Sequence, residues 1–142
     1  MTAPGARDVD SEEAMLSLGA ELARDVRGGQ VITLSGELGA GKTTLVRGML
    51  RGLGFEGRVK SPSYGLVESY EFDGLRVHHL DLYRLGDPGE LDFIGVQDLV
   101  GSDSTLLVEW PERAPDYLPE TARRIRIEFA EGGRRRVIGG PG

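Results

Sequence analysis

The fold is decided by one stretch of sequence, Gly36-Glu37-Leu38-Gly39-Ala40-Gly41-Lys42-Thr43. This stretch fits Gly-x-x-x-x-Gly-Lys-Ser/Thr, the phosphate-binding loop of nucleoside triphosphatases. Its glycines permit backbone angles that let a loop wrap around a phosphate and aim its N–H groups inward. The helix expected after it adds more N–H groups and a positive dipole end. The stretch therefore predicts a nucleotide-binding site in which the residues from Gly36 to Thr44 contact the phosphates.

Two side chains of the loop have individual predicted roles. Lys42 is expected to reach the β- and γ-phosphates as a mobile positive charge, which makes it a candidate catalytic residue as well as a binding residue. The Thr43 hydroxyl is expected to ligate Mg²⁺, a hard cation that prefers oxygen. The loop thus predicts both a nucleotide and a metal ion as cofactors.

The sequence on both sides of the loop supports this assignment. Residues 31–35 form a short apolar run that is typical of a buried strand. Residues 42–53 carry apolar side chains at helical spacing, and Gly52 and Gly54 end this predicted helix. The motif requires the order strand, loop, helix, so an accidental glycine-rich loop is a poor explanation.

Composition and charge limit the class of protein. With 142 residues, 39% of them hydrophobic and 28% charged, the chain suits one globular domain over residues 1–142. It contains no cysteine, which excludes disulfides and thiolate metal sites. No apolar run approaches the ~20 residues that span a bilayer, and residues 1–6 do not resemble a secretory signal, so a cytoplasmic protein is expected. The net charge of −6 argues against a broad surface of its own for nucleic acid.

The remaining segments indicate a mixed sheet. Ser11 suits an N-cap for an amphipathic helix that ends at Gly28-Gly29. Strand-like runs at 66–72 and 75–83 are joined by Asp73-Gly74, a strong hairpin signal, and a hairpin is antiparallel. Further predicted elements are a short helix from residues 87–90 with Leu91, Ile94 and Leu99 as core residues, an apolar strand at 105–110, and a closing hairpin of 123–129 with 134–138.

The expected fold class is therefore α/β. It is a P-loop NTPase-like three-layer sandwich with a mixed parallel and antiparallel sheet and β-hairpin insertions. Residues 1–9 and 139–142 are expected to fray, because they are small and polar. Arg134-Arg135-Arg136 is expected to be a solvated strand edge that discourages aggregation.

Two acidic residues are candidates to complete a hydrolytic site. Glu109 ends the apolar strand, and the carboxyl end of such a strand lies in the crevice where these sheets bind ligands. It is expected to ligate Mg²⁺ directly or through water, or to orient the attacking water. Asp81 shares a predicted strand face with His79 and Tyr83, which would line the metal and γ-phosphate pocket. For both acids the alternative is a side chain that simply faces solvent.

Three more residues allow two interpretations each. Ser63 lies in a loop before a strand, where a γ-phosphate sensor often sits, although Pro62 alone explains a turn there. Trp110 either stacks on a nucleotide base or fills core space at the end of its strand. A histidine such as His79 beside a carboxylate is more often a structural hydrogen-bond partner or a water positioner, and no zinc spacing is present.

Four segments together resemble the TsaE (YjeE) family, the small ATPases of bacterial tRNA threonylcarbamoyladenosine synthesis. The segments are residues 36–44 with Arg47-Gly48, Lys60-Ser61-Pro62-Ser63-Tyr64, His79-Leu80-Asp81-Leu82-Tyr83-Arg84-Leu85, and Val108-Glu109-Trp110-Pro111-Glu112. Their order and spacing agree from about residue 10 to about residue 130. Ser63 stands where the family commonly has Thr, and it keeps the hydroxyl.

The resemblance implies a subunit that binds ATP and slowly hydrolyses it to ADP and phosphate with Mg²⁺. It implies two larger partners, TsaB and TsaD, which modify the adenosine beside the anticodon and contact most of the tRNA, while the ATPase cycle resets their complex between turnovers. The family pattern places Thr43 and Glu109 at the metal with Asp81 close by, and Glu12 near the base. Such a subunit is expected to stay off membranes and to be a monomer or weak dimer alone, with weak ATPase activity.

Other functions also fit a phosphate loop. A small-molecule kinase would need an arginine-bearing lid, and the only candidate, residues 113–124, lacks a helical pattern. A nucleotide-locked assembly subunit would need no hydrolysis. A GTPase is disfavoured because guanine recognition typically uses Asn-Lys-x-Asp and the sequence contains no Asn.

Overall fold

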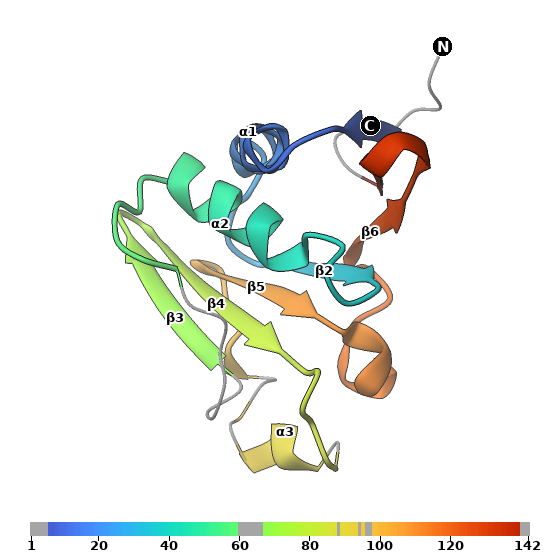
Figure 1. Cartoon of the computed structure of the whole chain (residues 1–142). Helices are drawn as coiled ribbons and strands as arrows, with labels where there is room; N and C mark the ends of the chain where they lie inside the picture. Colours follow the sequence, from blue (N-terminus) through green and yellow to red (C-terminus); the bar gives the residue numbers. More distant parts are fainter. Residues whose placement is uncertain (1–5, 60–66, 88, 94, 96–97, 140–142) are drawn as a thin grey trace. The chain divides into compact units, whose positions relative to one another are not determined.

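A computed structural model describes residues 6–59, 67–87, 89–93, 95 and 98–139 (Figure 1). The chain divides into two compact units. The first unit comprises Met1–Asp25, Leu34–Val59 and Arg124–Gly142, and the second comprises Val26–Thr33 and Lys60–Arg123. Strand β2 (Val31–Gly36) gives its first half to the second unit and its second half to the first.

Three antiparallel strands and the end of β2 form the sheet of the first unit. β1 (Ala6–Val9) pairs with β7 (Arg135–Ile138), and β7 pairs with β6 (Arg123–Phe129), which is followed by the end of β2. The closing hairpin predicted from sequence is therefore confirmed, with Glu131–Gly133 at its turn.

Strand β1 corrects two expectations. The prediction of fraying is wrong for Ala6–Val9, because these residues pair with β7 along their whole length. Since β7 has a neighbour on each side, its arginines do not form a strand edge. Arg136 instead forms an ion pair with Asp8, with 2.8 Å between Nε and Oδ1.

The helices of the first unit pack closely against each other. α1 (Glu12–Ala23) and α2 (Lys42–Gly52) lie side by side (Figure 1). A Cβ added at Gly19 would lie 2.5 Å from the Leu45 carbonyl oxygen, so the two backbones approach at a distance that only glycine allows. The buried apolar side chains of the two helices are Met15, Leu18, Leu22, Ala23, Leu45, Val46, Met49 and Leu50.

Helix α1 begins where the sequence predicts and ends earlier. The Ser11 side chain caps it by accepting a hydrogen bond from the Ala14 amide at 3.0 Å. The amides of Arg24 and Asp25 then bond to carbonyls three residues back, which tightens the last turn and ends the helix before the predicted Gly28-Gly29.

In the second unit the strand order is β2-β5-β4-β3. β3 (Val67–Phe72) and β4 (Leu75–Asp81) form the predicted antiparallel hairpin, with Asp73 and Gly74 as its two-residue turn. β5 (Ser104–Glu109) runs parallel to β4. The predicted mixture of parallel and antiparallel pairing is confirmed.

One side of this sheet is covered by a buried apolar cluster. Its members are Val31, Leu80, Leu82, Leu85, Leu91, Leu106, Val108 and Ala114. The short helix α3 (Glu90–Phe93) contributes Leu91 as predicted, and Leu99 is partly buried against the cluster, whereas Ile94 lies outside the described residues. Leu80 and Val108 of the cluster alternate along the strands with Asp81 and Glu109, so these two acids lie on the opposite face of β4 and β5.

The chain after β5 forms 3-10 turns at Pro111–Arg113 (η2) and Pro115–Tyr117 (η3).

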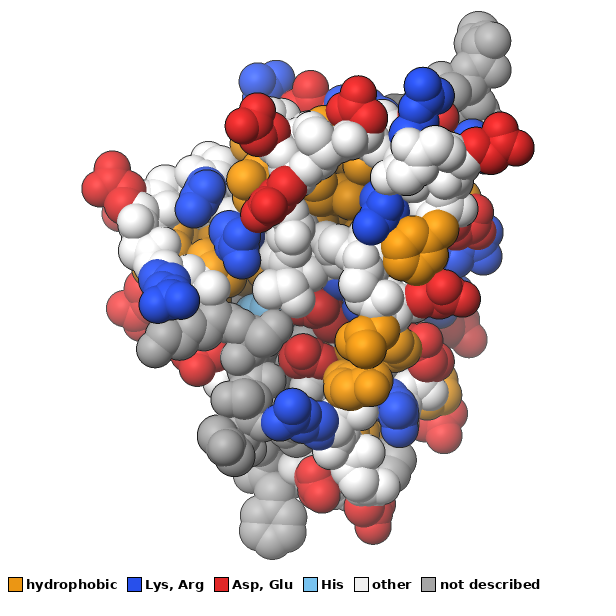
Figure 2. All heavy atoms as spheres, in the orientation of Figure 1, with side chains coloured by type: hydrophobic (Ala, Val, Ile, Leu, Met, Phe, Trp, Pro, Cys, Tyr) orange, Lys and Arg blue, Asp and Glu red, His pale blue; other side chains and the backbone are white. Residues whose placement is uncertain are grey.

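No helix in the described part of the chain is long and apolar enough to cross a membrane. On the face drawn in Figure 2, acidic and basic side chains are interspersed, and no continuous basic field forms among the described residues there.

Candidate functional site

The phosphate loop has the backbone that its sequence predicts. It joins the end of β2 to the start of α2, and Gly36, Gly39 and Gly41 have φ angles of 153°, 83° and 111°. These angles favour glycine over any residue with a Cβ. At Gly36 an added Cβ would also lie 2.6 Å from the carbonyl oxygen of Ile127 on β6. Glycine is therefore required at Gly36 both by its backbone angle and by the space around it.

Lys42 points back into the loop rather than out to solvent. The residue is 5% exposed, and its Nζ donates hydrogen bonds to the carbonyl oxygens of Gly36 at 2.5 Å and Glu37 at 3.0 Å. Helix α2 starts behind Gly41 with no side-chain cap and with no acid in its first turn. The loop thus gathers an ammonium group and the positive end of a helix dipole in one place, which suits an anion.

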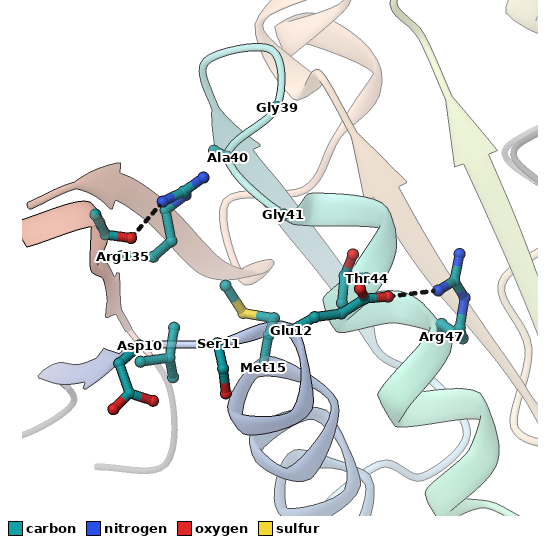
Figure 3. A pocket seen from close by; sticks show the side chains of 12 residues that line it. Asp10, Ser11, Glu12, Met15, Gly39, Ala40, Gly41, Thr44, Arg47 and Arg135 are labelled. Atoms are coloured by element: carbon teal, nitrogen blue, oxygen red, sulfur yellow. Dashed lines mark hydrogen bonds and ion pairs between the residues drawn. The ribbon is translucent and has the colours of Figure 1, made fainter.

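A pocket of about 360 Å³ adjoins the loop within the first unit (Figure 3). Its walls come from the start of α1, from the loop with α2, and from the turn between β6 and β7. The lining residues are Val9, Asp10, Ser11, Glu12, Met15, Gly39, Ala40, Gly41, Thr44, Arg47, Gly133 and Arg135. Glu12 is therefore brought to the same pocket as the phosphate loop.

Charged groups of both signs surround this pocket. Glu12 reaches from α1 to α2, where its Oε1 lies 3.2 Å from Nη1 of Arg47 (Figure 3). Arg135 donates to the carbonyl oxygen of Gly133 at 2.8 Å on another wall. The carboxylates of Asp10 and Glu12 can accept hydrogen bonds from amino or hydroxyl groups. The sequence did not point to Asp10 or Arg135, since only tertiary structure brings them to the loop.

The two predicted acids lie at adjacent strand ends in the second unit. Asp81 and Glu109 are register partners and are the last residues of the parallel strands β4 and β5. Glu109 is buried, and its Oε2 lies 2.6 Å from Nε2 of His79, which is fully buried. The predicted position of Glu109 at a strand end is thus confirmed, and Glu109 does not face solvent. Asp81, which was expected inside a strand over residues 75–83, ends β4 instead.

Tyr83 does not lie on the strand face where the sequence placed it. Asp81 accepts a hydrogen bond from the Tyr83 amide at 3.1 Å, which turns the chain as soon as β4 ends. Tyr83 is 39% exposed, and its ring stacks on Trp110 with a centroid distance of 4.9 Å and a tilt of 44°. The expected polar face of three residues therefore reduces to His79 and Asp81.

Trp110 follows Glu109 in an unusual backbone conformation. Its φ of 59° and ψ of 51° are left-handed, the only positive φ of a non-glycine residue in the described ranges. Its side chain packs against the apolar cluster and Tyr83. The guanidinium carbon of Arg113 lies 5.8 Å from the centroid of the Tyr83 ring. These contacts favour core filling over stacking on a base. Ser63 and the segment around it lie outside the described residues.

The donor chemistry of the predicted metal ligands fits Mg²⁺. No group of three or more His, Asp or Glu side chains among the described residues could hold a metal by itself. Mg²⁺ in nucleotide sites needs only one or two carboxylates beside a hydroxyl, phosphate oxygens and waters. The Thr43 hydroxyl and the carboxylates of Asp81 and Glu109 are oxygen donors of this kind. Their coordination of a metal stays a prediction.

Comparisons of the sequence with known proteins all match the same protein family. The model of a family described as "Threonylcarbamoyl adenosine biosynthesis protein TsaE" matches residues 9–138. A protein of Haemophilus influenzae called "tRNA threonylcarbamoyladenosine biosynthesis protein TsaE" is 49% identical over 104 residues, which are 73% of this chain and 66% of the relative. Proteins of the same name from Streptomyces coelicolor and Bacillus subtilis are 43% and 35% identical, over 83% and 92% of this chain and 81% of each relative.

A solved structure agrees with the fold. The crystal structure of Bacillus subtilis YdiB superimposes with a TM-score of 0.77 at 27% identity, covering 100% of this chain and 88% of the other. The α/β, P-loop-like class predicted from the loop at residues 36–43 is therefore confirmed by a fold as well as by the strands and helices of this chain.

Proposed function

The chain belongs to the TsaE family, and from this premise we propose that it is an ATP-binding and Mg²⁺-dependent ATP-hydrolysing subunit in tRNA threonylcarbamoyladenosine biosynthesis. One observation carries the nucleotide part of the proposal. The phosphate loop and the adjoining pocket share Gly39, Gly41 and Thr44, so a phosphate chain in the loop continues directly into a cavity of nucleoside size.

The proposed binding mode follows from the groups around the loop. The phosphates replace the carbonyls of Gly36 and Glu37 as partners of Lys42, because an ammonium pairs more strongly with an anion than with a neutral oxygen. The nucleoside enters the pocket, where carboxylates such as that of Glu12 accept from an amino or hydroxyl group. This arrangement suits ATP, whose adenine has an exocyclic amino group, but it would equally accept from the amino group of guanine.

The proposed hydrolysis uses residues of the phosphate loop and the two acids that were predicted from sequence. Mg²⁺ supplies charge neutralisation on the β- and γ-phosphates when it is bound. The Thr43 hydroxyl would hold it together with Glu109, directly or through water, and Asp81 would lie close by. Glu109 alternatively orients the attacking water, a role that suits a buried carboxylate held by a hydrogen bond. Lys42 stabilises the negative charge of the γ-phosphoryl group as it transfers to water.

The proposed partners are TsaB and TsaD, which carry out the transfer to tRNA while ATP hydrolysis resets their complex between turnovers. The net charge of −6 and the interspersed charges in Figure 2 support a subunit that leaves most tRNA contacts to its partners. A kinase is less well supported, because the candidate lid at residues 113–124 begins in 3-10 turns, Pro111–Arg113 and Pro115–Tyr117, where a helical lid would be needed.

Lys42→Ala tests the nucleotide part. Calorimetric titration with ATP and Mg²⁺ should show an affinity loss of about 100-fold or more, since charged hydrogen bonds contribute about 1.5–3 kcal/mol each. The control is Arg51→Ala, which removes a cation from the exposed end of the same helix and should change affinity less than about twofold. Unchanged ATP affinity in Lys42→Ala would contradict the site assignment.

Reconstitution tests the pathway part. Purified TsaB, TsaD, tRNA and an activated threonylcarbamoyl donor should form threonylcarbamoyladenosine over many turnovers with the wild-type chain and ATP, and stall after about one turnover with Lys42→Ala. Multiple turnovers without this chain would refute the proposed role, and rapid ATP hydrolysis by the chain alone would argue against partner dependence.

A further inference from the structure

His79 and Glu109 lie on the same face of the second unit's sheet. In parallel β4 and β5, register partners point to the same side, so His79, Asp81 and Glu109 share one face. The alternate residues Leu80 and Val108 belong to the apolar cluster on the opposite face. The imidazole of His79 therefore reaches along the strands toward Glu109, at the end where the predicted chemistry occurs.

The contact between the side chains of His79 and Glu109 is short and excluded from solvent. Nε2 of His79 lies 2.6 Å from Oε2 of Glu109, and the exposed fractions of the side chains are 0% and 3%. An ionised carboxylate can only accept hydrogen bonds, so Nε2 carries the hydrogen and donates it. A charge-assisted bond of this length in a buried place is strong and directional.

The other ring nitrogen of His79 argues against a role in packing alone. Nδ1 of His79 is buried and has no hydrogen-bond partner among the described residues. Leaving a buried polar atom unpaired lowers stability, so a histidine here is a poor choice for packing alone. Within the described part of the chain, the ring's polar contact is the bond to Glu109.

We propose that His79 is a positioning residue for Glu109. A glutamate side chain rotates about three bonds, and the bond from His79 fixes Oε2 and so sets the direction of the carboxylate. Groups that hold a ligating or water-orienting carboxylate in this way change metal affinity or activity by about 10- to 100-fold when removed. The inference rests on the proposed role of Glu109 and adds a residue that touches neither nucleotide nor metal.

Two variants of His79 in the full chain test the proposal by activity. His79→Leu removes the donor and should lower kcat for ATP hydrolysis about 10- to 100-fold while KM changes less than about threefold. His79→Gln places an amide N–H near the position of Nε2 and should recover most of the loss. Equal losses in both variants, or a wild-type kcat in His79→Leu, would overturn the proposal.

The matched control is the neighbouring histidine. His78 points to the other face of β4 and bonds to Ser69 at 2.7 Å, away from Glu109. His78→Gln should leave kcat and KM near wild type. If it lowers kcat as much as His79→Leu does, the loss comes from a disturbed β4 strand, and the positioning role is refuted.

A second readout needs no nucleotide. Proton NMR of the nucleotide-free full chain should show a slowly exchanging, downfield Nε2–H signal of His79 that disappears in Glu109→Ala. A signal that is absent from the wild type, or that persists in Glu109→Ala, would refute the bond itself. If the signal behaves as expected but Glu109→Ala hydrolyses ATP normally, the proposed role of Glu109 fails instead, so the two failures are distinguishable.

Discussion

The phosphate loop and the acidic strand ends are built in different ways. In the loop, backbone geometry sets the position of each polar group, through positive φ angles at three glycines and two carbonyls around Lys42. At the strand ends, a side chain from one strand holds a side chain of the next, His79 to Glu109. The loop therefore depends on the absence of Cβ atoms, and the strand ends depend on the presence of specific polar groups.

The largest expected effect comes from adding one carbon atom to the loop. Gly36→Ala should lower the free energy of unfolding by about 3 kcal/mol, through the strained φ and the contact with the Ile127 carbonyl. Gly39→Ala is the matched control, because its φ is also positive but no atom lies within 4 Å of the added carbon. It should cost about 1 kcal/mol. Urea unfolding measures both, and equal costs would contradict the role given to the β6 carbonyl.

The next effect distinguishes the role of Glu109 in ATP hydrolysis from a role in ATP binding. Glu109→Ala should lower single-turnover ATP hydrolysis about 100-fold and change ATP affinity by less than about threefold, because the phosphates are held by the loop. Rapid-quench and calorimetric measurements provide the two values. A variant that loses affinity in parallel with turnover would show that the strand ends contribute to binding, and the contrast between the two regions would break down.

A smaller effect concerns the pocket beside the loop. Glu12→Ala removes an acceptor and the partner of Arg47, and should weaken ATP binding about fivefold, or about 1 kcal/mol. Because Glu12 and Arg47 are partly exposed, the free energy of unfolding should fall by less than about 1 kcal/mol. Glu13→Ala removes the neighbouring acid of the same helical turn, which does not line the pocket, and should leave ATP affinity unchanged.

The smallest effect is a dependence of stability on pH outside both regions. Burial, and secondly the charge of Arg76, lower the pKa of His78 below its ordinary value of 6.5. The unfolded chain then binds a proton more readily than the folded chain, so this residue's contribution to stability is lost as pH falls below about 6.5. Urea unfolding between pH 7 and pH 5 should show a shallower loss in His78→Gln. An identical pH profile would remove His78 as the cause.

The loop could be predicted from sequence because its determinants are local. The strand, the glycines, Lys42 and the helix follow one another within about twenty residues. The residue pattern of this one continuous segment is therefore enough to predict each of them. The position of Glu109 at a strand end was predictable for the same reason, since it terminates an apolar run. Asp81 was expected inside a strand over residues 75–83, and the strand ends at Asp81 instead.

What the sequence could not predict depends on contacts between distant segments. The bond from His79 to Glu109 requires the parallel register of two strands, which no single segment encodes. Strand β1 has only four residues and little apolar character, and it becomes a strand because its backbone pairs with that of β7. Tyr83 leaves the expected strand face because the Asp81 side chain captures its amide and turns the chain.

The pairing of β1 with β7 has a consequence for synthesis on the ribosome. Residues near the start of the chain must wait for residues near its end, because Val9 pairs with Arg135. At about 5–20 residues per second, β1 stays without its partner strand for roughly ten seconds while the intervening chain is made. β1 then joins its sheet only after β7 has been made, although α1 and β2–β6 are translated before β7, and the pocket wall that begins at Val9 is completed no earlier.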